Sequence, residues 1–203
     1  MKISHLLASA ALALATCHAG AAVVSLNAQA TYLHTNEPTV LPSPVALRLS
    51  DFGFVAGDRI RLEVLGDIDN GPGGDTFTFT VGLFSSSNTL LAPSLLNRVP
   101  GALASDGAPI VTFPTFFGNQ ATDIAEDFGF DTPDGTIVTV PTGALYLFLA
   151  KTDQLYQDNS DPDGDYGVRL SRVTAEVPEP ASAALLLLGL ALLGVRPWSR
   201  RLD

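Results

Sequence analysis

Apolar and polar residues alternate one by one along two stretches in the first half of the chain. In residues 59–65, Ile60, Leu62 and Val64 alternate with charged residues, and in residues 76–81 threonines alternate with phenylalanines and a valine. A repeat of two residues places neighbouring side chains on opposite faces of a strand. We therefore predict two half-buried β-strands at these positions.

Several other segments have the length and composition of short strands and are separated by turns rich in Gly, Pro and Asp. Residues 144–150 are apolar throughout, which is typical of a strand buried on both faces. Residues 123–128 could form one acidic helical turn, but no long amphipathic helix is predicted. This order of elements predicts an all-β antiparallel β-sandwich of the jelly-roll or galactose-binding-like kind. The remaining predicted strands are 23–27, 30–33, 45–49, 136–140 and 166–173, and residues 66–75 are predicted to be a turn-rich loop.

The N-terminus has the three parts of a secretory signal peptide. Lys2 supplies a positive charge, residues 6–16 are largely apolar, and residues 19–21 provide small residues for cleavage. We predict a signal peptide over residues 1–21 and export of the remainder. The only cysteine, Cys17, lies inside it; lipidation of Cys17 is the alternative, although Thr16 is bulkier than the residue usually found there. A mature chain without cysteine must gain its stability from its core or from bound ions.

The C-terminus carries a separate apolar segment over residues 181–195, followed by Arg196, Arg200 and Arg201. This run of fifteen residues is shorter than the roughly 20 that cross a bilayer comfortably, so a transmembrane helix here would be marginal. Pro178 and Pro180 prevent a continuous helix from the preceding domain, and the arginines favour the cytoplasmic side. We predict that residues 177–203 are an appended module and that residues 22–176 form the working domain.

Val177 and the Pro178, Glu179 and Pro180 triplet, the apolar run and the terminal arginines together resemble the PEP-CTERM sorting signal. The resemblance implies processing by an exosortase, transient insertion in the inner membrane, and a final place at the cell surface or in the extracellular matrix, among biofilm and exopolysaccharide systems. An ordinary C-terminal membrane anchor would also explain the apolar run and the arginines, but it would leave the Pro-Glu-Pro triplet unexplained.

The working domain is strongly acidic once both termini are set aside. It retains seven basic and nineteen acidic residues, a net charge of −12. Nucleic acid and anionic lipid surfaces are poor partners for such a domain, because both attract positive patches. Divalent cations are better candidates.

The densest acidic stretch is residues 153–165. Oxygen-rich side chains of this kind are the ligands that Ca²⁺ prefers, and the ion takes 6–8 of them. The order from Asn159 copies the first half of an EF-hand loop, but Leu170 stands where the bidentate glutamate would be, so we reject an EF-hand and keep a loop calcium site. A solvated acidic turn is the alternative, because Asp, Asn and Gly also favour turns. The aspartates of this stretch are Asp153, Asp158, Asp161, Asp163 and Asp165.

The order of residues 55–62, of the apolar strand 144–150 and of residues 156–160 is similar to that of the calcium-dependent galactophilic lectins. The resemblance implies calcium ligation by the side chains of Asp158 and Asn159 and by the backbone carbonyl of Phe54, with Asp153 as the upstream acid. Two departures weaken the case for sugar binding: the insertion 161–165 and Lys151, which takes the position of that acid in a gapless alignment.

The inventory of reactive side chains argues against an enzyme. After loss of the signal peptide, His34 is the only histidine and no cysteine remains, which excludes Cys nucleophiles and His-rich zinc sites. A polysaccharide-active hydrolase stays open as a minor alternative, because Glu63, Glu126 and Asp127 could supply paired carboxylates.

These observations predict a non-enzymatic exported protein of the cell surface or extracellular matrix, processed by an exosortase and stabilised by Ca²⁺. A calcium-dependent carbohydrate-binding module, with a glycan or exopolysaccharide as its partner, is the main alternative.

Overall fold

The computed structural model describes residues 20–32, 40–71, 74–76, 79–91, 97–104, 107–108, 126–130, 134–153 and 155–174. The chain divides into two units, Met1–Arg172 and Val173–Asp203. The predicted signal peptide, apart from Gly20 and Ala21, and the predicted sorting tail with its helix lie outside the described residues. Within the described ranges, no helix is both long enough and apolar enough to cross a bilayer.

The first sheet is antiparallel and contains five strands in the order β1-β12-β3-β9-β7. β3 lies at its centre, and the neighbouring β12 pairs with it along six residues, from Gly167 opposite Leu65 to Arg172 opposite Ile60. The strands of this sheet are β1 (Ala22–Ser25), β3 (Arg59–Leu65), β7 (Leu103–Ala104), β9 (Thr136–Thr139) and β12 (Gly167–Arg172).

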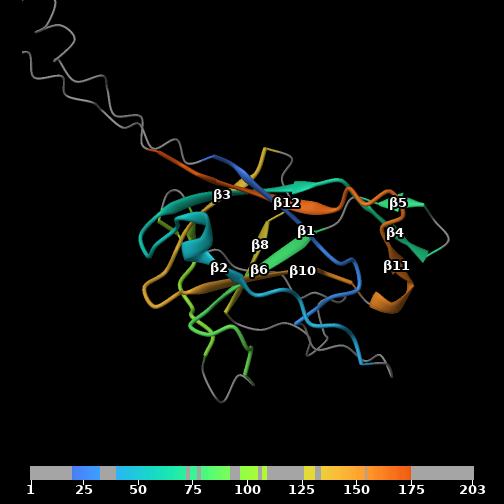
Figure 1. Ribbon diagram of the computed structural model, residues 1–203, viewed down its shortest axis with the longest axis horizontal. Helices are drawn as coiled ribbons and strands as arrows, with labels where there is room; N and C mark the ends of the chain where they lie inside the picture. The colour runs from blue at the N-terminus through green and yellow to red at the C-terminus, as the bar shows by residue number, and fades with distance from the viewer. Residues whose placement is uncertain are drawn as a thin grey trace, which may run out of the picture. The chain divides into compact units, whose positions relative to one another are not determined.

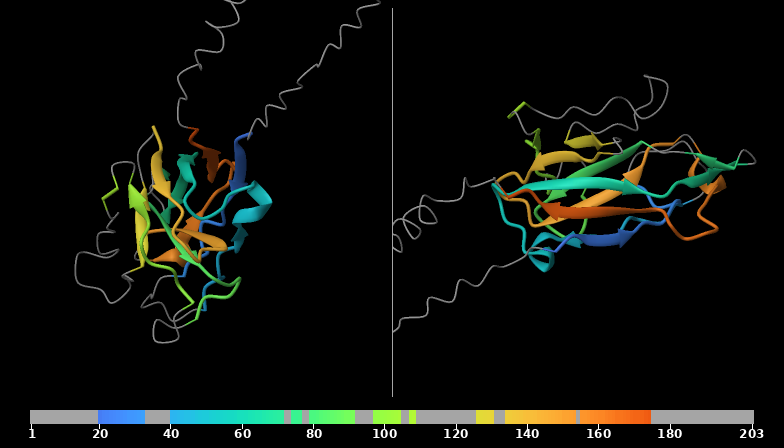
Figure 2. Two further views of the ribbon diagram at one scale, coloured as in Figure 1. Left: turned by 90° about the vertical axis from the view of Figure 1, so that its left-hand side faces the viewer. Right: turned by 90° about the horizontal axis from the view of Figure 1, so that it is seen from above.

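The second sheet is also antiparallel and has the order β2-β10-β6-β8. Figures 1 and 2 show it as a second layer, with β10 and β6 lying across from β3 and β12. Its strands are β2 (Leu47–Arg48), β6 (Thr80–Ser85), β8 (Asp127–Phe130) and β10 (Tyr146–Lys151). A short 3₁₀ helix, Leu49–Phe52, follows β2.

One apolar core joins the two sheets. Ile60 and Leu62 of β3 contribute to it from one side, and Phe84 of β6 and Phe128 of β8 from the other, all of them fully buried. The two phenylalanine rings stack with their centroids 5.2 Å apart. The predicted antiparallel β-sandwich is therefore confirmed.

The alternating pattern predicted β3 correctly. Ile60 and Leu62 face the core, while the alternate residues Arg61 and Glu63 remain partly exposed. The strand predicted at 76–81 is displaced: β5 covers Asp75–Thr76 and β6 begins at Thr80. All six residues of β6 are buried because it lies between β10 and β8 and is covered on both faces, so its pattern of burial does not alternate.

Two other elements differ from the sequence prediction. The helical turn predicted at 123–128 is wrong at its end, since Asp127–Phe130 forms β8 and pairs with β6; residues 123–125 lie outside the described residues. Pairing with a distant strand outweighs the local helical spacing of the acidic residues. No strand forms over residues 30–32, where Ala30 instead closes a turn by donating to the carbonyl of Asn27.

A third, small sheet is formed by the segments that follow β3 and precede β12 along the chain. Its order is β11-β4-β5, with β4 (Ile68–Asn70) between β11 (Asn159–Ser160) and β5 (Asp75–Thr76). It replaces part of the turn-rich loop predicted at 66–75. It also brings the acidic stretch 153–165 beside β4, because Asn159 pairs with Asn70 and Ser160 with Asp69.

Candidate functional site

The acidic stretch connects β10 to β12 and contains a short 3₁₀ helix, Tyr156–Asp158, followed by β11. The sequence predicted a loop there, and the structure adds these two short elements. They separate two groups of predicted ligands that face different surroundings, and two further predicted ligands belong to neither group.

The outer group consists of Asp161, Asp163 and Asp165. One carboxylate oxygen of each lies within 4.8 Å of the other two, and Asp163 and Asp165 are exposed. Asp161 is also held by the loop backbone: its Oδ1 accepts from the Gly164 amide at 3.0 Å and its Oδ2 from the Tyr166 amide at 3.3 Å. The three side chains can therefore reach one ion of the size and charge of Ca²⁺.

The turn after β3 approaches this group closely. Gly66 has φ +61°, and a Cβ there would lie only 2.0 Å from Oδ1 of Asp165, so the position requires glycine. The next amide, of Asp67, donates to the same oxygen at 3.3 Å. Asp165 therefore packs closely against the β3–β4 turn and is held there by the Asp67 amide.

The side chain of Asp67 adds a fourth negative charge beside the outer group. Partial desolvation by the surrounding loop, and then the charges of the neighbouring carboxylates, raise the pKa of Asp67 above its usual value. The contributing carboxylates are, in decreasing order, those of Asp165, Asp163, Asp69 and Asp161. Crowding of this kind is unfavourable near neutral pH unless a cation offsets it.

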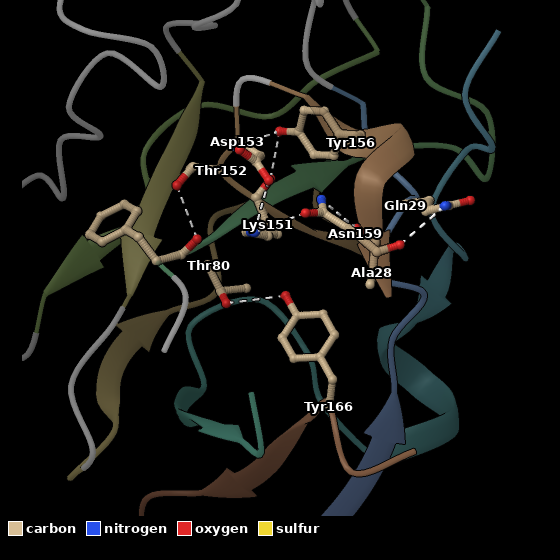
Figure 3. A network of polar contacts seen from close by, with 10 residues as sticks. Ala28, Gln29, Thr80, Lys151, Thr152, Asp153, Tyr156, Asn159 and Tyr166 are labelled. Atoms are coloured by element: carbon tan, nitrogen blue, oxygen red, sulfur yellow. Dashed lines mark hydrogen bonds and ion pairs between the residues drawn. The ribbon is translucent and has the colours of Figure 1, made fainter. Parts of the chain in front are cut away.

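The inner group surrounds a buried lysine. Lys151 is the last residue of β10 and is 4% exposed. Its ammonium group donates to Oδ2 of Asp153 at 2.8 Å and to Oδ1 of Asn159 at 3.2 Å. Figure 3 shows the lysine amine lying between these two side chains. Two of the predicted calcium ligands thus bind an ammonium group of the chain itself.

Tyr156 supports the inner group from the 3₁₀ helix. Its hydroxyl donates to the carbonyl of Lys151 at 2.7 Å and accepts from the amide of Asp153 at 3.1 Å (Figure 3). Burial raises the pKa of Tyr156 far above its usual value, with smaller opposing effects of hydrogen bonds to Thr31 and Asp153. The hydroxyl therefore remains protonated and able to donate at any ordinary pH.

The remaining predicted ligands lie elsewhere. Phe54 follows the 3₁₀ helix after β2, and Arg172, at the far end of β12 from Asp165, places its guanidinium 5.5 Å from the centre of the Phe54 ring. Asp158 is exposed and approaches Gly71, at the turn that follows β4. The structure therefore does not bring Phe54 to the acidic stretch, and it places the Asp158 carboxylate near Gly71.

The sequence prediction missed the parts played by Lys151 and Asp67. A signal for Lys151 was present, because a single charged residue ends an otherwise apolar strand, and the repeat of two places it on the same face as Leu147 and Leu149. No comparable signal marks Asp67, whose approach to Asp165 depends on the pairing of β3 with β12.

Fold and site together define an antiparallel β-sandwich protein with an acidic loop between β10 and β12. The remaining evidence comes from the tail, where residues 176–201 match the family model of the PEP-CTERM protein-sorting motif. The predicted PEP-CTERM signal is thus confirmed, and the chain is an exported protein of the kind that exosortases process, with a transient stage at the membrane. A search of the curated proteins finds no match to the chain, and neither does a search of the solved structures.

Proposed function

We propose that this protein is a non-enzymatic component of the cell surface or extracellular matrix, associated with exopolysaccharide or biofilm. Ca²⁺ bound by the acidic loop stabilises one end of its β-sandwich. The observation that carries the proposal is the approach of Asp161, Asp163 and Asp165 within 4.8 Å. The raised pKa of the adjacent Asp67 supports it, because a cation would relieve the same repulsion.

A bound calcium ion would link two segments of the chain that are distant in sequence. The outer group lies on the loop before β12, while Asp67 and Asp69 come from the segment after β3. An ion held between these segments would join neighbouring strands of the first sheet to the small third sheet. An ion that binds only the folded state raises its stability by mass action.

A thermal melt of the exported protein in Ca²⁺ and in EGTA tests this proposal. We expect the melting temperature to be higher in Ca²⁺, and the difference to shrink in Asp163→Asn. The matched control is Asp51→Asn, which removes an exposed carboxylate from the 3₁₀ helix after β2 and should leave the calcium effect unchanged. A wild-type melt that does not respond to Ca²⁺ would remove the ion from the proposal.

A calcium-dependent carbohydrate-binding module is a second candidate, favoured by one observation. Asp163 and Asp165 are exposed, so that an ion they hold would face solvent and could accept sugar hydroxyls. Retention on exopolysaccharide only in the presence of Ca²⁺ would support this function. Equal retention with chelator, or none at all, would count against it.

A hydrolase that uses paired carboxylates is less well supported, because two of the candidate carboxylates lie on different sheets. Glu63 lies on β3, where its Oε2 accepts a hydrogen bond from Nη1 of Arg169 at 3.0 Å, whereas Asp127 is 3% exposed on β8 of the other sheet. The absence of enzymatic activity remains part of the proposal and is tested by incubating the protein with the exopolysaccharide of its host and measuring reducing ends.

A further inference from the structure

The inner group contains an amine, a carboxamide and a carboxylate in mutual contact. Nζ of Lys151 lies 3.2 Å from Oδ1 of Asn159 and 2.8 Å from Oδ2 of Asp153. Lys151 and Asn159 are 4% and 2% exposed, and the side chain of Asp153 is 10% exposed. The three groups come from β10, the residues after it, and β11, and Figure 3 shows them converging.

The orientation of the Asn159 amide follows from its partners. An ammonium group can only donate, so the atom that faces Lys151 must be the carbonyl oxygen. The amide nitrogen then donates to the backbone carbonyl of Ala28 at 3.2 Å. The carbonyl carbon of Asn159 consequently lies one bond of about 1.23 Å beyond the oxygen that the lysine amine already contacts.

The surroundings of the inner group exclude water and fix the side chains. Leu147 and Leu149, which share a face of β10 with Lys151, belong to the main core. Tyr156 and Tyr166 are at most 1% exposed, and the Tyr166 hydroxyl lies 3.4 Å from Oγ1 of Thr80. A fixed, water-excluded contact is the condition under which an intramolecular reaction gains most from proximity.

We propose that Lys151 and Asn159 form an intramolecular isopeptide bond. In this reaction Asp153 accepts a proton from the lysine ammonium, and the neutral Nζ attacks the carbonyl carbon of Asn159. As the C–N bond to Nδ2 breaks, the attacking nitrogen gives up a second proton, the departing NH₂ group takes up both protons, and one ammonium ion leaves for each amide bond made. Oxidation states do not change, so that the step needs no redox partner or cofactor.

Asp153 acts in this reaction as the general acid–base group. It contacts the attacking amine directly, and in its protonated form it can return the proton to the leaving nitrogen. Its own position is fixed because its backbone amide donates to the Tyr156 hydroxyl. The carboxylate is therefore held beside the reacting atoms by an element that does not itself react.

The bond would join the end of β10 to β11 and close the loop that carries the Tyr156–Asp158 helix. A covalent closure restricts the unfolded chain in the way a disulfide does. The mature chain has no cysteine if the signal peptide is removed as predicted, so it cannot form a disulfide. An isopeptide bond would supply a covalent crosslink in its place.

Intact-mass measurement of the exported protein, purified from cells that process it, tests the proposal. We expect a mass below that of the processed sequence by one molecule of ammonia. Chymotryptic cleavage after Tyr156 should then leave the fragments bearing Lys151 and Asn159 linked. The full sequence mass, with fragments that separate, would overturn the proposal.

Amine labelling gives an independent readout, because Lys2 and Lys151 are the only lysines and Lys2 lies in the predicted signal peptide. The denatured mature protein should carry label on its N-terminal amine alone. Label on Lys151 at full stoichiometry would contradict the crosslink.

Two variants test the role of Asp153. Asp153→Asn should fold, as judged by circular dichroism, yet retain the mass of the uncrosslinked chain; formation of the bond in this variant would overturn the assignment of Asp153. Asp158→Asn removes the exposed neighbouring carboxylate and should crosslink like the wild type. If Asp153→Asn does not fold, the wild-type mass still decides the proposal.

Discussion

At the scale of single residues, the acidic stretch contains two sites that differ in how the negative charge of their aspartates is offset. Asp153 lies beside a lysine of the chain, so its charge is offset internally. Asp161, Asp163 and Asp165 form a group whose members are exposed or partly exposed. The first arrangement fixes the loop to β10, whereas the second leaves oxygen atoms available to an external ion.

Tyr156→Phe tests the hydrogen bonds that support the inner group. The change removes a buried hydroxyl that donates to Lys151 and accepts from Asp153. We expect the free energy of unfolding, measured in urea, to fall by about 1–3 kcal/mol, because it leaves buried polar groups unsatisfied. Tyr146→Phe, at a partly exposed position of β10, should have a much smaller effect.

The pH dependence of stability provides a second test at Tyr156. Burial raises the pKa of Tyr156 above its value of about 10 in the unfolded chain. Between these two values the folded state binds more protons than the unfolded state, so the free energy of unfolding should be unaffected below about pH 10 and should decline above it. Tyr156→Phe should decline less steeply than the wild type over the same interval; identical slopes would show that another group causes the loss.

At the scale of elements, local pattern predicted some strands well and others poorly. β3 was predictable because its two faces differ, with Ile60 and Leu62 inside and charged residues outside. β8 was not predictable, because the acidic residues up to Asp127 have a helical spacing. Only the pairing of this segment with the distant β6 makes it a strand.

The candidate site was predictable in the same limited sense. The density of aspartates indicated the correct loop, and the structure brings three of them together. The sequence could not show that Asp153 and Asn159 would bind Lys151, or that Phe54 would lie at the other end of β12, because both depend on strand register.

Phe128→Ala tests the packing of β8 against β6. The Phe128 ring is fully buried, stacks on Phe84, and lies against Gly82, where a Cβ would come within 2.6 Å of the ring. Truncation should lower the free energy of unfolding by about 3–5 kcal/mol through lost contacts and the cavity left behind. Val23→Ala, at a 60% exposed position of β1, is the control and should change it little. An equally small effect of Phe128→Ala would mean that β8 does not complete the core.

At the scale of the whole molecule, the chain combines an acidic, cysteine-poor β-sandwich with a sorting motif over residues 176–201. The motif determines where the protein goes, and the sandwich determines what it does there. The two parts can be tested separately because they lie in separate stretches of the chain.

Replacing Pro178, Glu179 and Pro180 by alanine tests the sorting motif. The altered tail should no longer be processed, because the triplet that the motif requires is absent, and the uncleaved chain should accumulate in the membrane fraction. Immunoblots of membrane and extracellular fractions measure this. Asp203→Asn, beyond the matched residues, is the control; normal release of the alanine variant would show that the triplet is dispensable.

The central claim about the sandwich is that its acidic loop binds Ca²⁺. Isothermal titration of Ca²⁺ into the chelator-treated exported protein measures this directly. We expect saturable binding that is lost or strongly weakened in Asp163→Asn and retained in Asp51→Asn. Absence of saturable binding by the wild-type protein would contradict the claim.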